Sequence, residues 1–141
     1  MHITRGFKGK ARHGLEIRDR VPPGQYVTSD FPVLTAGPTQ HRALHDWTLS
    51  LQLGGNLLTR WDWKEFAALP ETELKADIHC VTKWSKLDTR WRGVTVDDLL
   101  AAAGVRELPT RFLMAHCDGG YTTNYEIADL IDRRAMIATH Y

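Results

Sequence analysis

Residues 47–56, WTLSLQLGGN, carry the pattern that most constrains the fold of this chain. Apolar and polar side chains alternate along the first seven residues, which is typical of a β-strand with one face on a core and the other in water. The Gly54–Gly55 pair that follows predicts a tight turn. A half-buried strand therefore has to be part of the fold.

Further strands and short helices are predicted on both sides of Gly54–Gly55. Residues 21–39 are rich in Pro and Gly, and they predict an extended loop pinned onto a core. The remaining patterns predict a strand continuing into a short helix within 57–70, strands within 73–81, 110–117 and 134–141, and short helices within 93–105 and 124–132. The strand at 110–117 is predicted to be buried. This mixture predicts an α+β fold, a mixed β-sheet with short helices.

Composition and charge narrow the class of protein. With 141 residues, 43% hydrophobic and 25% charged, the chain suits one soluble domain. No apolar run reaches the roughly 18 residues that cross a bilayer, and no secretory signal precedes the domain, so we expect a cytoplasmic protein with no membrane span. Residues 1–20 hold six Lys or Arg against two acidic residues. We interpret 1–20 as a basic, disordered arm without the aromatic residues of a nucleic-acid platform, and 21–141 as the domain.

Cys80 ends an apolar strand pattern and begins a loop, and three interpretations of its thiol remain open. It is a buried structural thiol, because free cysteines are among the most buried residues. It is a zinc ligand with the His79–Cys80 and His116–Cys117 pairs, although adjacent strand residues point to opposite faces and such pairs fit zinc poorly. Or it is a thiolate that acts as a nucleophile or as a ligand to a cofactor metal.

Donor groups follow the cysteine and favour the third interpretation. They are Thr82, Lys83, Trp84, Ser85, Lys86, Arg90, Trp91 and Arg92. Such groups can surround an anionic ligand and lower the pKa of a thiol, although filling of the core explains the two tryptophans equally well. A cysteine hydrolase would need a histidine, such as His116 or His140, within hydrogen-bond reach of Cys80.

Several motifs together resemble the molybdopterin-binding domain of the sulfite oxidase family, in particular its cytoplasmic stand-alone members. They are PPGQY at 22–26, FPVLTAG at 31–37, DWTLSL at 46–51, HCVTKWS at 79–85, RWRGVTVDDLL at 90–100 and FLMAHCDGGYTT at 112–123. Each motif alone is weak, but their joint occurrence is specific. The resemblance covers about residues 21–141.

The resemblance implies a molybdenum–molybdopterin cofactor in which Cys80 is the sole protein ligand to the metal. Ser29, Pro32 and Val33 fall where relatives cradle the pterin, and Cys117 falls near a further cofactor contact, although a partly buried structural thiol is an open alternative for it. The implied activity is transfer of an oxygen atom to or from a small substrate such as sulfite or a sulfoxide, with an external electron donor or acceptor. The alternative is a non-catalytic binding or scaffold module that keeps the fold without metal.

The C-terminal sequence departs from the family pattern. Relatives continue with Gly-Gly-Pro-Leu-Arg and Gly-x-Lys-Ser segments that hold the pterin phosphate, and neither occurs in 1–141. The final strand pattern, 134–141, also stops without a polar tail. We therefore expect the chain to be a fragment, inactive as it stands.

Overall fold

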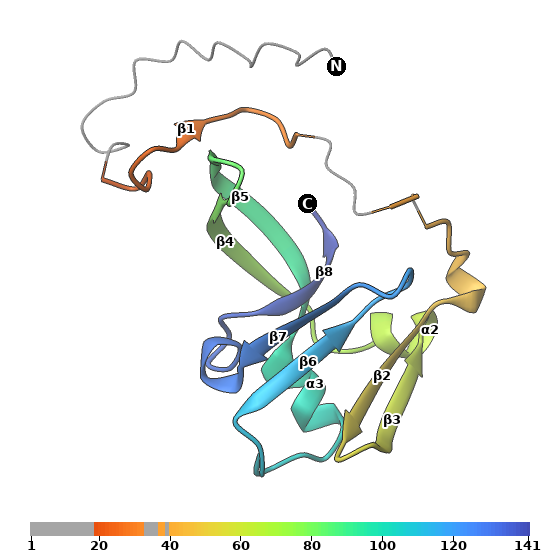
Figure 1. Cartoon of the computed structure of the whole chain (residues 1–141). Coiled ribbons are helices and arrows are strands. Elements are labelled where there is room, and N and C mark those ends of the chain that lie inside the picture. Colours follow the sequence, from red (N-terminus) through yellow and green to blue (C-terminus); the bar gives the residue numbers. More distant parts are fainter. Residues whose placement is uncertain (1–18, 33–36, 39) are drawn as a thin grey trace. The chain divides into compact units, whose positions relative to one another are not determined.

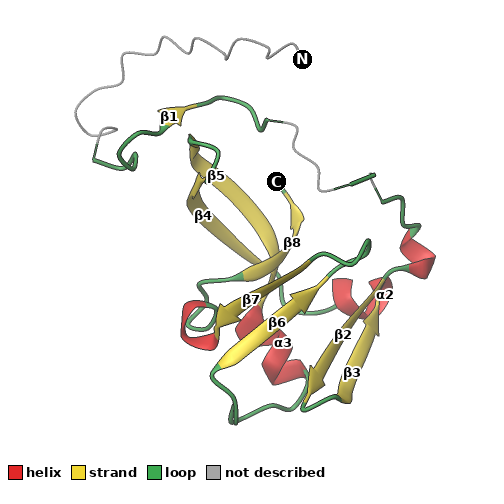
Figure 2. Cartoon of the chain, in the orientation of Figure 1, coloured by secondary structure: helices red, strands yellow, loops and turns green. Residues whose placement is uncertain are grey.

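The computed structural model of the chain describes residues 19–32, 37–38 and 40–141, which form two compact units (Figure 1). Of the described residues, 19–32 and 74–90 belong to the first unit, and 37–38, 40–73 and 91–141 belong to the second. Strands predominate in the ribbon and the helices are short (Figure 2). The predicted α+β fold class is therefore confirmed. Most of the predicted basic arm, and Val33 of the predicted cofactor cradle, lie outside the described residues.

The first unit is built on a hairpin of two long strands, β4 (Thr72–His79) and β5 (Trp84–Thr95). The short strand β1 (Tyr26–Val27) pairs in parallel with the start of β5, so the strand order is β1-β5-β4. Strand β1 thereby brings the Pro- and Gly-rich segment onto the end of the hairpin that carries its turn, as Figure 1 shows.

The hairpin turn has a defined backbone. The amide N–H of Lys83 donates to the carbonyl oxygen of Cys80 at 3.0 Å, and the amide of Cys80 donates to the carbonyl oxygen of Trp84 at 2.9 Å. Lys83 has a φ of 73°. A residue in this left-handed conformation after a tight turn lets the turn follow the twist of the two strands. The turn places Cys80 at the tip of the hairpin.

An ion-pair network joins the segment before β1 to the hairpin. The guanidinium of Arg20 donates to both carboxylate oxygens of Asp77, at 2.9 and 2.5 Å, and it also reaches Asp88, at 3.0 and 3.4 Å. Lys75 approaches the same Asp88 carboxylate at 2.8 Å. Two forked hydrogen-bonding contacts on one guanidinium define its orientation better than a single surface pair would.

The second unit contains the remaining elements. They are the 3₁₀ turns η1 (Leu44–Asp46) and η2 (Ile127–Asp129), the helices α2 (Trp63–Ala67) and α3 (Val96–Ala102), and the strands β2 (Thr48–Leu53), β3 (Asn56–Asp62), β6 (Phe112–His116), β7 (Thr122–Glu126) and β8 (Met136–His140). Strands β2 and β3 form one antiparallel hairpin, and β6 and β7 form another. Strand β8 pairs with the last residues of β5.

The core of the second unit lies between the β2–β3 hairpin and the two helices. Its buried members are Trp61, Phe66, Val94 and Leu99. The ring centroid of Trp47, just before β2, lies 5.0 Å from that of Phe66. The alternating exposure of β2 confirms the predicted half-buried strand, because its leucines turn inward and its polar residues outward.

Helix caps account for where the two helices begin. The side chain of Asp62 accepts the amide N–H of Glu65 at 2.8 Å, and the carboxylate of Glu65 accepts the amide of Asp62 in return. Thr95 caps α3 by accepting the amide of Asp98. Such caps satisfy backbone N–H groups that a helix leaves without partners, which makes these short helices possible.

Gly93 allows β8 to lie directly on β5. A Cβ atom at Gly93 would stand 2.1 Å from the carbonyl oxygen of Ile137 and 2.7 Å from the Cα of Ala138. The pairing of the two strands is irregular between Arg92 and Gly93. A hydrogen at this position is therefore a packing requirement.

Two sequence predictions fail in the second unit. The helix expected within 124–132 is absent as such, since Asn124 lies in β7 and only the 3₁₀ turn at Ile127–Asp129 is helical. The strand expected within 110–117 forms, but Phe112 and Met114 are 53% and 56% exposed, so it is not buried. Among the described residues, no helix combines the length and apolar character that a membrane crossing requires.

Candidate functional site

Cys80 is a free, partly exposed thiol at the tip of the β4–β5 hairpin. The hydroxyl of Thr82 donates to its Sγ atom at 3.2 Å. This hydrogen bond, supported by the backbone amides of Thr82 and Val81, lowers the pKa of the Cys80 thiol, against a smaller effect of burial. The turn therefore favours the thiolate, which is the form that binds soft metals.

His79, the last residue of β4, contacts Ser85 through its ring. Its Nδ1 atom lies 2.9 Å from the hydroxyl oxygen of Ser85. Ser85 is fully buried, and its hydroxyl donates to Oε1 of Gln25 at 2.5 Å. Within the part of the chain that the structure describes, the hydrogen bond to the Cys80 sulfur comes from Thr82 and not from a histidine.

Gln25 completes the polar network behind the turn. Its Nε2 atom donates to the carbonyl oxygen of Cys80 at 3.3 Å. The sequence motifs include this residue within PPGQY, but its role is not readable from the sequence, because its partners lie 55 and 60 residues away. The one sequence feature that points to a role for Gln25 is that its polar side chain directly follows a Pro-Pro-Gly turn.

The segment that follows β1 is attached to the same hairpin through Phe31. The ring of Phe31 meets the indole of Trp84 edge to face, with centroids 5.8 Å apart, and Nζ of Lys86 lies 4.4 Å from the Phe31 ring centroid. Ser29 and Pro32, on either side of Phe31, are exposed. The first unit thus contains both Cys80 and the two described residues of the predicted pterin cradle.

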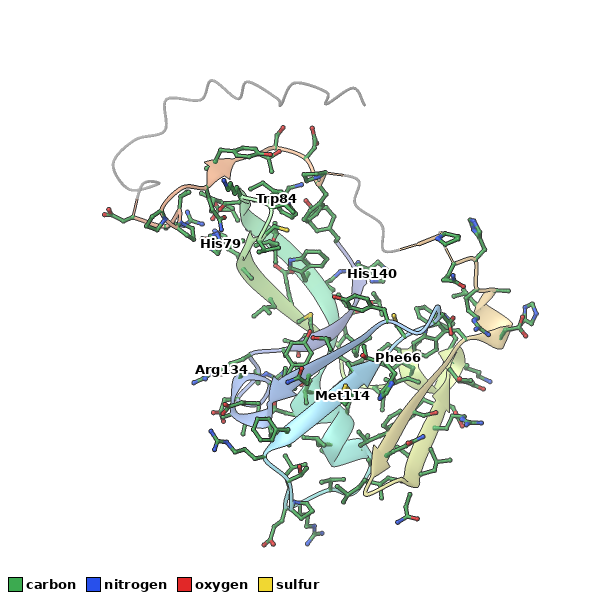
Figure 3. The ribbon with its side chains drawn as sticks, viewed as in Figure 1. Phe66, His79, Trp84, Met114, Arg134 and His140 are labelled. Carbon is green, nitrogen blue, oxygen red and sulfur yellow. The ribbon has the colours of Figure 1, made fainter. Side chains whose placement is uncertain are left out.

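The indole N–H of Trp84 is buried and has no hydrogen-bond partner within the described residues. Its side chain belongs to the residue that follows the Cys80 turn, and Figure 3 shows it with His79 at that end of the hairpin. Leaving such a donor unsatisfied costs about 1–3 kcal/mol. A bound group that offers an acceptor would remove this cost, so this residue suits a ligand with a hydrogen-bond acceptor.

Cys117 lies in the second unit, directly after β6. Its amide N–H donates to the carbonyl oxygen of Tyr121 at 3.0 Å, which closes the β6–β7 turn. Its thiol is free and exposed, so the expected partly buried structural thiol is wrong.

The donors that follow Cys80 in the sequence are divided between the two units. Trp91 and Arg92 belong to the second unit, where the Trp91 ring centroid lies 4.8 Å from that of Tyr141 and Arg92 pairs with Glu71 at 3.3 Å. His116 and His140 belong to that unit as well. Among the described residues, no group of three or more His, Cys, Asp or Glu side chains gathers in the manner of a metal site.

Comparisons with known proteins agree with this geometry. Residues 36–141 match the family described as oxidoreductase molybdopterin binding domain. The chain is also similar to the uncharacterized oxidoreductase YuiH of Bacillus subtilis (strain 168), with 35% identity over 133 residues. These residues are 94% of this chain and 66% of that protein, so the chain spans about two thirds of the length of the curated relative it matches. No solved structure matches the chain.

Proposed function

Because the chain belongs to the oxidoreductase molybdopterin-binding domain family, we propose that it binds a molybdenum–molybdopterin cofactor through Cys80. One observation carries the proposal: a partly exposed thiol, with its pKa lowered by Thr82 and backbone amides, stands at the tip of a defined turn. A thiolate is a soft ligand, and soft ligands suit a metal that is otherwise held by sulfur.

Other residues of the chain would bind the organic part of the cofactor. We assign Ser29, Pro32 and Val33 to the pterin, with Phe31 anchoring their segment on the Cys80 hairpin. We also assign Cys117 to the cofactor, on the family resemblance alone. The unsatisfied indole N–H of Trp84 is a donor that the bound group would meet. When bound, the cofactor supplies the two-electron chemistry that accompanies oxygen-atom transfer.

The substrate class follows from that chemistry. We propose a small oxygen-atom donor or acceptor, such as sulfite or a sulfoxide, and an external electron donor or acceptor in the cytoplasm. On this proposal, the metal ligand Cys80 and the two described cradle residues, Ser29 and Pro32, belong to one unit.

Metal analysis tests the role of Cys80. The chain is expressed with added molybdate in a host that makes the cofactor, and molybdenum is measured per chain after gel filtration. We expect about one molybdenum per chain for the unchanged protein and less than about a tenth of this for Cys80→Ser, because a hydroxyl is a poor replacement for a thiolate ligand.

The matched control is the same exchange at the other cysteine, Cys117→Ser. It should reduce the molybdenum content much less than Cys80→Ser does, and near-ultraviolet circular dichroism should show all three proteins folded. Equal molybdenum in the unchanged chain and in Cys80→Ser would contradict the ligand role. A folded chain that takes up no molybdenum would contradict cofactor binding by residues 1–141.

A further inference from the structure

The Pro-Pro-Gly-Gln segment forms a tight turn directly before β1. The amide N–H of Gln25 donates to the carbonyl oxygen of Pro22 at 3.1 Å, and Gly24 has a φ of 79°. These are the features of a type II turn, in which proline suits the second position and glycine the third. A Cβ at Gly24 would meet nothing within 4 Å, so the glycine is required by its backbone conformation. The turn fixes the point from which the Gln25 side chain leaves the backbone.

Both ends of the Gln25 amide are used. Its Nε2 donates to the carbonyl oxygen of Cys80 at 3.3 Å, and its Oε1 accepts the hydroxyl proton of Ser85 at 2.5 Å. A hydroxyl has a single proton. Ser85 therefore accepts at its oxygen from Nδ1–H of His79, 2.9 Å away. The hydrogen bonds run in one direction, from His79 through Ser85 and Gln25 to the backbone of Cys80.

The same segment continues into the predicted pterin cradle. After Gln25, the amide of Tyr26 donates to the carbonyl oxygen of Lys83 at 3.0 Å, and the amide of Thr28 donates to that of Ser85 at 2.9 Å. Ser29 follows immediately. One side chain thus joins the turn that carries the thiol to the strand that leads to the cradle.

We propose that Gln25 is a positioning residue for the metal ligand. Its amide holds the backbone of Cys80 in register with the segment that carries Ser29 and Pro32, and so sets the direction in which the thiolate faces the cofactor. The proposal rests on the proposed function for the identity of the ligand, but the hydrogen bonds on which it depends are properties of the metal-free chain.

The exchange Gln25→Glu separates the two ends of the amide. A glutamate has nearly the same shape and still accepts from Ser85, but it has no N–H to donate and would place a carboxylate against the Cys80 carbonyl. Gln25→Ala removes both contacts. The matched control is Gln52→Glu, which makes the same chemical change at an exposed position on β2 in the second unit.

The first measurement is amide hydrogen exchange of the metal-free protein at the Cys80 turn. We expect the amides of Cys80 and Lys83 to exchange about fivefold faster in Gln25→Glu and in Gln25→Ala, as loss of one hydrogen bond predicts. Gln52→Glu should leave them unchanged. Unchanged exchange in Gln25→Glu would overturn the proposal.

The second measurement follows the tautomer of His79 by its ring nitrogen resonances. The Nδ1–H form should persist in Gln25→Glu, whose carboxylate still accepts from Ser85, and it should be lost in Gln25→Ala. If exchange at the turn increases only when this tautomer is lost, Gln25 supports Ser85 and not Cys80, and the proposal is wrong.

The third measurement uses the loaded protein. The sulfur-to-metal absorption band should shift in Gln25→Glu and stay unchanged in Gln52→Glu, because only the former alters the geometry of the ligand. If the unchanged chain binds no metal, the proposed function fails while the exchange and tautomer results still decide the role of Gln25. If metal binds through Cys80 and the band does not move in Gln25→Glu, the positioning role fails and the function stands.

Discussion

Phe31 lies edge to face against Trp84, with ring centroids 5.8 Å apart, and this contact fastens the Ser29–Pro32 segment to the hairpin that carries Cys80. The two residues are 53 positions apart in the sequence. Edge-to-face pairs of this kind contribute about 0.5–1.5 kcal/mol beyond the area they bury. The contact gives the segment a defined place beside the turn.

Replacing Phe31 by alanine should therefore release this segment. We expect Phe31→Ala to lower the free energy of unfolding by about 1–2 kcal/mol and to shift the fluorescence of Trp84 to longer wavelength, because the indole gains solvent. The control is Phe112→Ala, because Phe112 is 53% exposed in the second unit. It should change the free energy of unfolding by no more than about 0.5 kcal/mol and leave the emission wavelength unchanged. An unshifted emission spectrum in Phe31→Ala would argue against the contact.

Thr82 should control the acidity of the Cys80 thiol. Its hydroxyl is the main cause of the lowered pKa, so Thr82→Val should raise the thiol pKa toward its ordinary value, and Thr82→Ser should retain most of the effect. The measurement is the pH dependence of alkylation in a Cys117→Ser background, where Cys80 is the only thiol. Identical profiles for the valine and serine variants would refute this assignment.

The Arg20 network predicts sensitivity to acid. Hydrogen bonds from Lys75 and Arg20 lower the pKa of Asp88 to about 2, and Arg20 also lowers the pKa of Asp77. A carboxylate whose pKa is lower in the folded chain than in the unfolded chain stabilises the folded chain when the pH is above the unfolded pKa of about 4. This stabilisation is lost as the pH falls from about 4 toward 2. Urea unfolding between pH 6 and pH 2.5 should show this loss.

Arg20→Gln should flatten that dependence, since the carboxylates then lose the guanidinium that distinguishes the folded from the unfolded state. Arg42→Gln, which removes an ion pair with Asp118 at 2.8 Å in the second unit, should leave it in place. Equal pH dependence in the unchanged chain and in Arg20→Gln would show that the network does not act on stability.

Gly93 offers a test of packing. In Gly93→Ala the new methyl group meets the backbone of β8 at 2.1 Å, and the strand pairing must open, at a cost of about 3 kcal/mol or more. Gly120→Ala is the matched control, because it has open space around it and a φ of 81°, which costs about 1–2 kcal/mol by backbone strain alone. Similar losses of stability in both variants would contradict the close approach of the strands.

Patterns of neighbouring residues correctly predicted the elements that form from nearby residues alone. The alternation in 47–53 gave the correct strand, and the turn at Gly54–Gly55 and the helix before Gly104 also formed as expected. The pattern of 124–132 predicts a helix, but pairing with Met114 across the β6–β7 hairpin places Asn124 in a strand. Pairing between distant segments overrides a weak local preference.

In the candidate site, too, neighbouring residues predicted some features, and contacts between distant segments determined the others. The position of Cys80 directly after a strand followed from the apolar pattern before it. The family resemblance is confirmed by the comparisons. The exposure of Cys117 and the contacts of Gln25 depend on which segments meet in space, and no local pattern contains that information.

The bonds of Arg20 have a practical consequence for anyone who shortens this chain. A truncation that starts at Val21, where the Pro- and Gly-rich segment begins, would discard the guanidinium that neutralises two carboxylates of the hairpin. Asp77 would then lose its guanidinium partner, and Asp88 would keep its pair with Lys75. Starting the shortened protein one residue earlier, at Arg20, would preserve both contacts of the guanidinium.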